Sequence, residues 1–263
     1  MKIVFDIGGT STRVARRAED GLGDIRKVPT PQRPEEGIPA LAKLIRECAG
    51  SEPLEAAAGG FPGVMADGTI HYAPNLPKWK GVDLSAELSN LLEVSVEVMN
   101  DADCAALGEA SRGAGVGFRV VAYVGVGTGI GCGRIVEGRI DTGAYDLEAG
   151  HQIIDARSGE ALEELASGRA FEKRFGVHPR EAPRRGYVEM TPILSAGLYN
   201  MVLHWSPEVL VLGGSMMNED NGYRLRDIGT ALERFPKVYP KLPPLRAALL
   251  KDEAGLYGAM MLL

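Results

Sequence analysis

The sequence predicts an α/β fold in which helices cover β-sheets, and three observations carry this prediction. Short apolar runs with strand character alternate along the chain with segments of helical periodicity. Glycine-rich turns follow several of these apolar runs. The chain contains 34 glycines among 263 residues, about twice the average usage, so many positions need close backbone approach or a special conformation. Ligands of such folds bind at strand ends, and we expect the function there.

The first half of the chain begins with a predicted β-hairpin, because Ile3–Phe5 and Val14–Ala15 are apolar runs on either side of the Gly8–Gly9 turn. The apolar residues of 38–48 recur at helical spacing after a Pro/Glu-rich start, which predicts a helix. A buried strand, a helix, a second strand and an Ala-rich helix are expected at 56–63, 85–92, 94–99 and 102–112.

The second half repeats the opening arrangement of strand, Gly/Thr turn and strand. After the glycine-rich link 113–117, a predicted strand at 120–124 leads into the turn 125–133 and a further extended piece at 134–136. We interpret this as an internal duplication of the hairpin. Beyond it the pattern predicts helices at 161–175 and 190–205, a buried strand at 209–212, and loops at 179–186 and 235–246.

The composition excludes several classes of protein. Lys and Arg total 29 against 35 Asp and Glu, and the net charge of −6 disfavours a nucleic-acid or anionic-membrane surface. The hydrophobic fraction of 45% and the charged fraction of 24% are typical of globular proteins. The three scattered cysteines, Cys48, Cys104 and Cys132, predict neither a disulfide framework nor a Cys-x-x-Cys metal site. With no apolar run of membrane-spanning length and no signal peptide, we expect a cytoplasmic protein.

Both glycine turns have the composition of an anion-binding loop, since small residues let backbone N–H groups approach phosphate oxygens and a Thr hydroxyl adds a donor. Either turn alone could be an ordinary hairpin turn that binds no ligand. Two such turns together with a further glycine pair, each after a buried strand, indicate nucleotide binding. Neither turn has the P-loop or the dinucleotide-binding pattern. The residues concerned are Gly8, Gly9 and Thr10, then Gly127, Thr128 and Gly129, and finally Gly213 and Gly214.

The order of these motifs resembles the actin/hexokinase-type ATPase superfamily and, within it, the ROK family of bacterial sugar kinases. The resemblance implies a two-lobed, actin-like (ribonuclease H-like) fold with an active site in the cleft between the lobes. Residues 1–117 and 248–263 would form the smaller lobe, and residues 118–247 would form the larger one. The resemblance also implies that the protein is a homodimer. The matching stretches are 60–63, 75–79, 100–109, 127–131, 148–151, 162–168, 211–214 and 254–259.

The resemblance implies phosphorylation of a hexose, glucose or a close relative, at O6, with ATP and Mg²⁺. Amides and carboxylates suit a sugar because each can orient paired hydroxyl groups. Tyr72 and Trp79, which flank the Asn75 loop, are expected to pack into the core, and a mobile rim over the sugar is the alternative for them. The implied sugar contacts are Gly63, Asn75, Asn100, Asp101, Glu148, His151 and Glu163, and the glycine turns would hold the nucleotide.

Two aspartates carry the implied chemistry. Asp101 would be the general base that takes the proton of the attacking hydroxyl. From the residues alone, an equally good interpretation is that Asn100 or Asp101 only caps the helix that follows. Asp6 would help to place Mg²⁺, although an Asp at this position can also simply initiate a turn.

The sequence departs from the family at one point. Most ROK members carry a Cys-x-Cys-Gly-x-x-Gly-Cys zinc element after a Glu-x-Gly-His motif, whose His is the fourth ligand. Here 152–160 contains no cysteine, so we expect no zinc. His151 then either contacts sugar or is an ordinary hydrogen-bonded histidine, and the shortened loop could displace Glu163.

Two rival functions remain open. Short, zinc-free relatives resemble polyphosphate-dependent glucokinases, so polyphosphate is an alternative donor. A non-catalytic sugar sensor is the second alternative. The family's transcription repressors carry a helix-turn-helix ahead of the kinase-like body, whereas the Asp6 motif lies almost at Met1. We therefore expect no nucleic-acid partner and no membrane partner.

Overall fold

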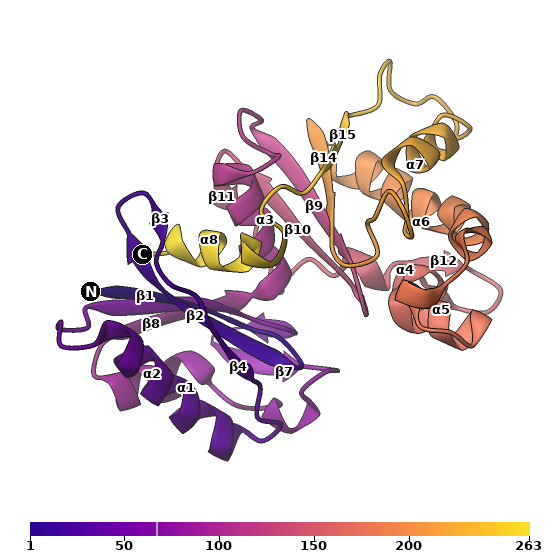
Figure 1. Ribbon diagram of the computed structural model, residues 1–263. Helices are drawn as coiled ribbons and strands as arrows, with labels where there is room; N and C mark the ends of the chain where they lie inside the picture. Colours follow the sequence, from indigo (N-terminus) through magenta and orange to yellow (C-terminus); the bar gives the residue numbers. More distant parts are fainter. Residues whose placement is uncertain (67) are drawn as a thin grey trace.

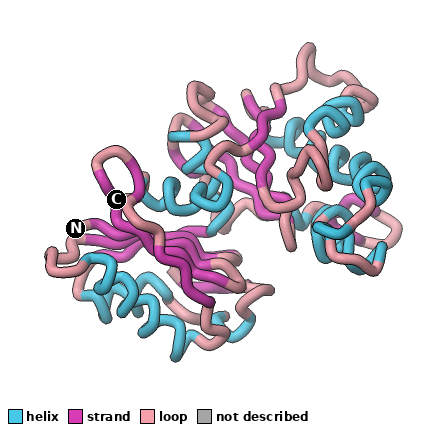
Figure 2. The backbone as a smooth tube through the Cα atoms, viewed as in Figure 1, coloured by secondary structure: helices cyan, strands magenta, loops and turns pink. Residues whose placement is uncertain are grey.

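The computed structural model describes residues 1–66 and 68–263, and its framework is a pair of β-sheets with helices packed against them (Figures 1 and 2). This arrangement confirms the predicted α/β fold. The six-stranded sheet contains β1 (Lys2–Ile7), β2 (Ser11–Ala18), β3 (Gly21–Leu22), β4 (Arg26–Pro29), β5 (Ala56–Phe61) and β8 (Ser95–Asn100). The five-stranded sheet contains β9 (Val120–Val126), β10 (Ile130–Val136), β11 (Arg139–Ile140), β14 (Val209–Gly213) and β15 (Leu245–Ala247).

The two sheets repeat one topology. In the first, β1 and β2 form an antiparallel hairpin, and β5 and β8 extend the sheet in parallel on the β1 side. In the second, β9 and β10 form the antiparallel hairpin, and β14 and β15 extend it in parallel on the β9 side. The predicted glycine turns occupy the same corner of each hairpin. The topology thus supports the interpretation of an internal duplication.

The N-terminal sheet is covered on one face by α1 (Pro34–Ala49) and α2 (Leu84–Leu92), as Figure 1 shows. The apolar stripes of both helices are buried with Phe5, Phe61 and Trp79 in one core. Trp79 is fully buried, as predicted, and ends a short 3₁₀ helix at Pro77–Trp79. A small hairpin of β6 (Val64–Ala66) and β7 (Thr69–Tyr72) projects beside this core.

The C-terminal helices differ in two places from the sequence prediction. The single helix expected at 161–175 is two helices, α4 (Leu162–Ala166) and α5 (Gly168–Phe175), because Ser167 interrupts the first and caps the second by accepting from Ala170 N–H. Helix α6 (Arg184–Trp205) begins inside the expected loop 179–186, directly after Pro183. None of the described helices is long and apolar enough to cross a bilayer.

Three further elements near the C-terminus were not predicted. Helix α7 (Leu225–Leu232) and strand β15 are short, and β15 overlaps the end of the expected loop 235–246, where its pairing with β14 creates it. The third is α8 (Ala254–Met260). A two-stranded hairpin of β12 (Ile153–Asp155) and β13 (Glu160–Ala161) occupies the segment where the zinc element of the family would lie.

Helices α3 (Asp101–Arg112) and α8 cross between the two sheets (Figure 1). Apolar residues of α3 are buried against the C-terminal sheet, whereas those of α8 are buried against the N-terminal sheet. The helices touch through glycine, because a Cβ at Gly258 would lie 1.7 Å from the Cys104 carbonyl oxygen. This contact couples the two halves of the molecule. The expected lobe boundaries at 117/118 and 247/248 stay a prediction.

Candidate active site

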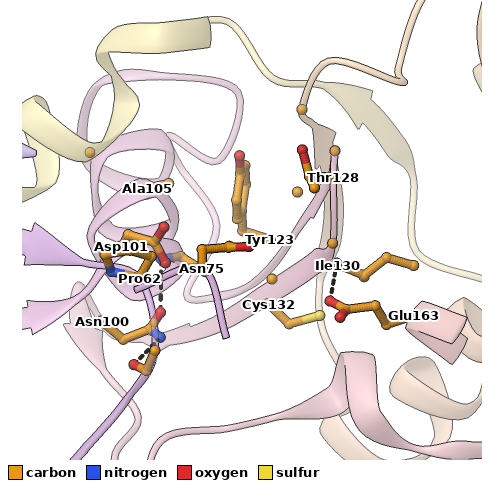
Figure 3. A pocket seen from close by; sticks show the side chains of 18 of the residues that line it. Pro62, Asn75, Asn100, Asp101, Ala105, Tyr123, Thr128, Ile130, Cys132 and Glu163 are labelled. Atoms are coloured by element: carbon orange, nitrogen blue, oxygen red, sulfur yellow. Dashed lines mark hydrogen bonds between the residues drawn. The ribbon is translucent and has the colours of Figure 1, made fainter. Parts of the chain in front are cut away.

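A cavity of about 330 Å³ lies between the two sheets, where strands β1, β8, β9 and β14 end. Ligands of open α/β sheets bind at such strand ends. Figure 3 shows Asn75, Asn100 and Asp101 along one wall and Thr128, Ile130 and Glu163 along the opposite wall. The cavity therefore joins groups that lie far apart in the sequence.

The junction of β8 and α3 places Asp101 at the cavity. Asn100 is the N-cap of α3, since its Oδ1 accepts from Ala102 N–H at 2.8 Å and from Asp103 N–H at 3.1 Å. Its Nδ2 donates to the carbonyl oxygen of Gly63 at 2.9 Å. The capping that sequence reasoning left open between two residues is thus performed by Asn100, and the next side chain, Asp101, lines the cavity.

Burial raises the pKa of the Asp101 carboxyl to about 7. The neighbouring carboxylates of Asp6 and Glu148 contribute to this rise, while the backbone N–H of Ala102 opposes it. A carboxyl group with this pKa can both accept and release a proton near neutral pH, as a general base must.

Asp6 lies at the end of β1 and is held by Arg13, whose Nη1 is 3.2 Å from Oδ2 of Asp6. Burial raises the pKa of Asp6, and the Arg13 guanidinium partly offsets that rise. Glycine keeps the other carboxylate oxygen open, since a Cβ at Gly255 would lie 3.0 Å from Oδ1. Mg²⁺ commonly takes one or two carboxylates together with substrate phosphates, so this buried carboxylate fits the predicted magnesium site.

A short 3₁₀ helix, Ala149–His151, carries the second group of predicted sugar contacts. His151 Nε2 lies 3.6 Å from Glu148 Oε2, and the ring of His151 meets Tyr72 edge-on across the cavity rim. Burial raises the pKa of Glu148, and His151 opposes that rise. The carboxylate and the imidazole form a polar pair at the cavity mouth.

Glu163 is fixed in place despite the shortened loop. Its Oε2 accepts from Ile130 N–H at 2.7 Å and its Oε1 accepts from Arg169 Nη2 at 2.7 Å. These bonds hold the start of α4 against the second glycine turn. All the predicted sugar contacts line the one cavity: Gly63, Asn75, Asn100, Asp101, Glu148, His151 and Glu163.

The second glycine turn and the third glycine pair reach the cavity through Gly127, Thr128, Gly129 and Gly214. Gly214 has φ +89°, and a Cβ there would lie 2.3 Å from the Val126 carbonyl oxygen, so glycine is required. The first turn lies beside the cavity, because a Cβ at Gly9 would be 2.9 Å from Cβ of Asn75. Gly8, Gly9, Thr10 and Gly213 are not among the lining residues, and nucleotide binding by either turn or by the glycine pair stays a prediction.

Sequence reasoning missed several residues of the cavity wall. Arg13, Lys251 and Asp252 line it, and Arg13 bonds to Asp252 at 2.9 Å as well as to Asp6. The sequence signal for Arg13 was a charged residue beside the apolar pair Val14–Ala15 of the predicted hairpin. The prediction that Tyr72 packs into the core is wrong. Tyr72 ends β7, is 49% exposed and lines the cavity, whereas Ile70 of the same strand is buried in the N-terminal core.

The segment that follows His151 does not fit a zinc ion. It contains no cysteine, and among residues 1–66 and 68–263 no group of three or more His, Cys, Asp or Glu side chains is placed to hold a metal. A structural zinc site needs four such ligands.

The ROK family matches residues 2–263. An N-acetyl-D-glucosamine kinase of Citrobacter koseri is 30% identical over 98% of this chain and 97% of its own. The solved ROK hexokinase of Thermus thermophilus superposes with a TM-score of 0.82 at 30% identity, covering 98% of this chain and 95% of the other.

A ROK glucokinase of Streptomyces griseus, solved with glucose and AMPPNP, superposes with a TM-score of 0.80 at 27% identity, covering 99% and 98%. The actin-like ATPase fold of these proteins accounts for the duplicated sheets and the cavity between them. The chain is a sugar kinase and belongs to the ROK family.

Proposed function

We propose that this kinase transfers the terminal phosphoryl group of ATP to a hexose hydroxyl, the O6 of glucose or of a close relative, with Asp101 as general base. The observation that carries the proposal is the Asp101 carboxyl. It has a pKa of about 7 and lines a cavity that has polar side chains on one wall and a glycine turn on the other. The glucose and AMPPNP in the Streptomyces griseus relative support the choice of sugar and donor.

The residues of the cavity divide the chemistry between them. Asp101 takes the proton of the attacking sugar hydroxyl. The hydroxyl oxygen bonds to the terminal phosphorus of ATP as the bond to ADP breaks and ADP leaves. A positioned base of this kind contributes about 10²- to 10⁴-fold to the rate. Asn75, Asn100, Glu148, His151 and Glu163 orient the sugar hydroxyls by accepting and donating hydrogen bonds.

The phosphates would lie against the backbone N–H groups of the glycine turns, whose small residues allow close approach. Asp6 would hold Mg²⁺, which neutralises phosphate charge when bound. Arg13 keeps the Asp6 carboxylate oriented through its 3.2 Å contact.

A coupled phosphorylation screen tests the proposal, with ATP as donor and glucose, mannose, fructose, allose and N-acetylhexosamines as acceptors. We expect glucose or a close relative to give the highest kcat/KM. Asp101→Ala should abolish turnover and leave sugar binding measurable by calorimetry. Full activity of Asp101→Ala would overturn the assigned base.

The same screen with polyphosphate in place of ATP tests the alternative donor. Sugar binding without turnover for every donor and acceptor would instead indicate a sensor. The expected homodimer is tested by light scattering of the purified chain.

A further inference from the structure

The turn that carries Glu148 and His151 belongs to neither large sheet. Gly150 packs one side of it against β10, where a Cβ would lie 2.1 Å from the Ile130 carbonyl oxygen, and its other side needs an anchor of its own. The side chains of Glu148 and His151 are partly exposed, at 32% and 41%, and apolar burial contributes little to holding them. A sugar site requires its polar groups within a fraction of an ångström of the productive geometry. The residue that follows the turn, Gln152, supplies the contacts that meet this requirement.

The side-chain amide of Gln152 is hydrogen-bonded through all of its polar groups. Its Nε2 donates to the carbonyl oxygens of Ala149 at 2.8 Å and Gly197 at 3.3 Å. Its Oε1 accepts from Nδ2 of Asn200 at 2.9 Å. These three bonds join the Glu148–His151 turn to the long helix α6.

The backbone of Gln152 extends the same connection to Glu163. Its carbonyl oxygen accepts from Leu162 N–H at 2.9 Å, one residue before Glu163. Leu162 packs closely against α6 at Gly197, where a Cβ would lie 2.4 Å from Cδ2 of Leu162. Gln152 thus contacts the segment that carries Glu148 and His151 and the segment that carries Glu163.

We propose that Gln152 is a positioning residue for sugar. Its hydrogen bonds to α6 hold the Glu148–His151 turn in place without a metal, where zinc-containing relatives use the zinc element. The proposal rests on the proposed function, because it takes Glu148, His151 and Glu163 as sugar ligands. It also accounts for the difference at this point of the chain, where most family members have a zinc element and this protein has residues that do not fit zinc. Two carbonyl acceptors and one amide donor fix the turn in a single orientation.

Gln152→Met tests the proposal, because methionine keeps the length and apolar volume of the side chain and removes the amide. We expect the KM for sugar to rise about tenfold, which corresponds to about 1.4 kcal/mol of sugar binding. The KM for ATP should stay within about twofold, since the amide lies on the sugar side of the cavity. Asn200→Ala should produce the same pattern. The double variant should raise the KM for sugar no more than the single variant with the larger effect does.

Tyr187→Phe is the matched control. It removes one buried hydrogen bond of the same helix, from the Tyr187 hydroxyl to the Pro179 carbonyl oxygen, at the end remote from Gln152. It should lower the melting temperature and leave both KM values unchanged. Equal sugar KM for Gln152→Met and the wild type would overturn the proposal.

Two measurements do not depend on turnover. Amide hydrogen exchange at 148–152 should accelerate in Gln152→Met and not in Tyr187→Phe, and unchanged exchange would overturn the proposal even if no hexose is phosphorylated. The wild type, purified from zinc-supplemented medium, should contain no stoichiometric zinc by mass spectrometry and should melt at the same temperature with a chelator. One zinc per chain would overturn it. An inactive wild type with fast exchange in Gln152→Met would refute only the proposed function.

Discussion

Asn100 caps helix α3 with its side-chain oxygen, and this leaves the carboxyl of the next residue, Asp101, on the cavity wall. The two residues that sequence reasoning could not separate therefore have different tasks. Asn100 also ties α3 to Gly63 through its amide nitrogen. Asn100 fixes the helix and also lines the cavity, whereas Asp101 presents its carboxyl to the cavity without capping the helix.

Asn100→Ala should cost about 1 kcal/mol of the free energy of unfolding from the lost cap. Asn100→Asp should keep the cap, because a carboxylate oxygen accepts the same N–H groups, but it cannot donate to the Gly63 carbonyl oxygen. We therefore expect Asn100→Asp to lower the melting temperature, because the Gly63 carbonyl oxygen loses its donor and faces a carboxylate oxygen, and to raise the sugar KM. Calorimetry and steady-state kinetics measure the two effects. Equal KM values for Asn100→Asp and the wild type would refute the role of the Gly63 bond.

The pH dependence of kcat/KM should follow the Asp101 carboxyl. A general base acts only when ionised, and burial raises this pKa to about 7. We expect kcat/KM to be level above about pH 8 and to fall about tenfold per pH unit below about pH 6. The measurement is a pH series at saturating ATP and low sugar. A profile that is level down to pH 5 would contradict this assignment.

Asp101→Asn should stabilise the fold at high pH. The unfolded carboxyl has a pKa near 3.8, and the folded one has a pKa of about 7. The folded state therefore binds the extra proton, and the wild type loses stability as the pH rises from 4 to 7. Asparagine has no such proton, so the gain in melting temperature should be large at pH 8 and small at pH 4. A gain that does not change with pH would contradict the raised pKa.

The hairpins, the glycine turns and the buried strands were predictable because local patterns specify them. Val120–Val124 and Val209–Leu212 are continuous apolar runs that end in glycine, and both lie in strands of the second sheet. β15 could not be predicted in this way, because its three residues are a strand only through pairing with β14. The start of α6 at Arg184 was hidden by a polar first turn without apolar periodicity.

The site was predictable where motifs mark it and not where packing creates it. The aspartates and glycine turns stand at strand ends that the sequence reveals. Arg13, Lys251 and Asp252 reach the cavity only because β2 and the segment before α8 fold against Asp6. Tyr72 was assigned to the core, yet it stands at the end of β7 on the cavity, while Ile70 of the same strand occupies the core.

Substitutions of Lys251 should separate the effect of its charge on the KM for ATP from the effect of its strained backbone on stability. Lys251 has φ +50° and lines the cavity. Glycine adopts this conformation freely, so the folded state of Lys251→Gly should gain about 1 kcal/mol. Loss of the ammonium group should raise the KM for ATP several-fold, because the phosphates lose a cation. Lys251→Ala should raise that KM equally without the gain in stability. An unchanged KM for ATP in both variants would place the phosphates away from Lys251.

Gly258→Ala tests whether the crossing of α3 and α8 couples the base to the fold. The added Cβ would lie 1.7 Å from the Cys104 carbonyl oxygen, so the two helices must separate. We expect a loss of about 3 kcal/mol, at the upper end of the cost of overpacking, because backbone rather than a side chain must move. Turnover should fall as well, since α3 begins at Asp101.

Gly229→Ala is the control for this substitution. Gly229 also lies in a helix, α7, but the nearest atom to its added Cβ is Leu245 Cδ1 at 3.8 Å. Alanine should stabilise this helix by about 0.5–1 kcal/mol through backbone entropy. Denaturant unfolding and kcat measure both variants. If Gly258→Ala unfolds at the same denaturant concentration as Gly229→Ala, the helices are not in backbone contact, and the position of Asp101 does not depend on their crossing.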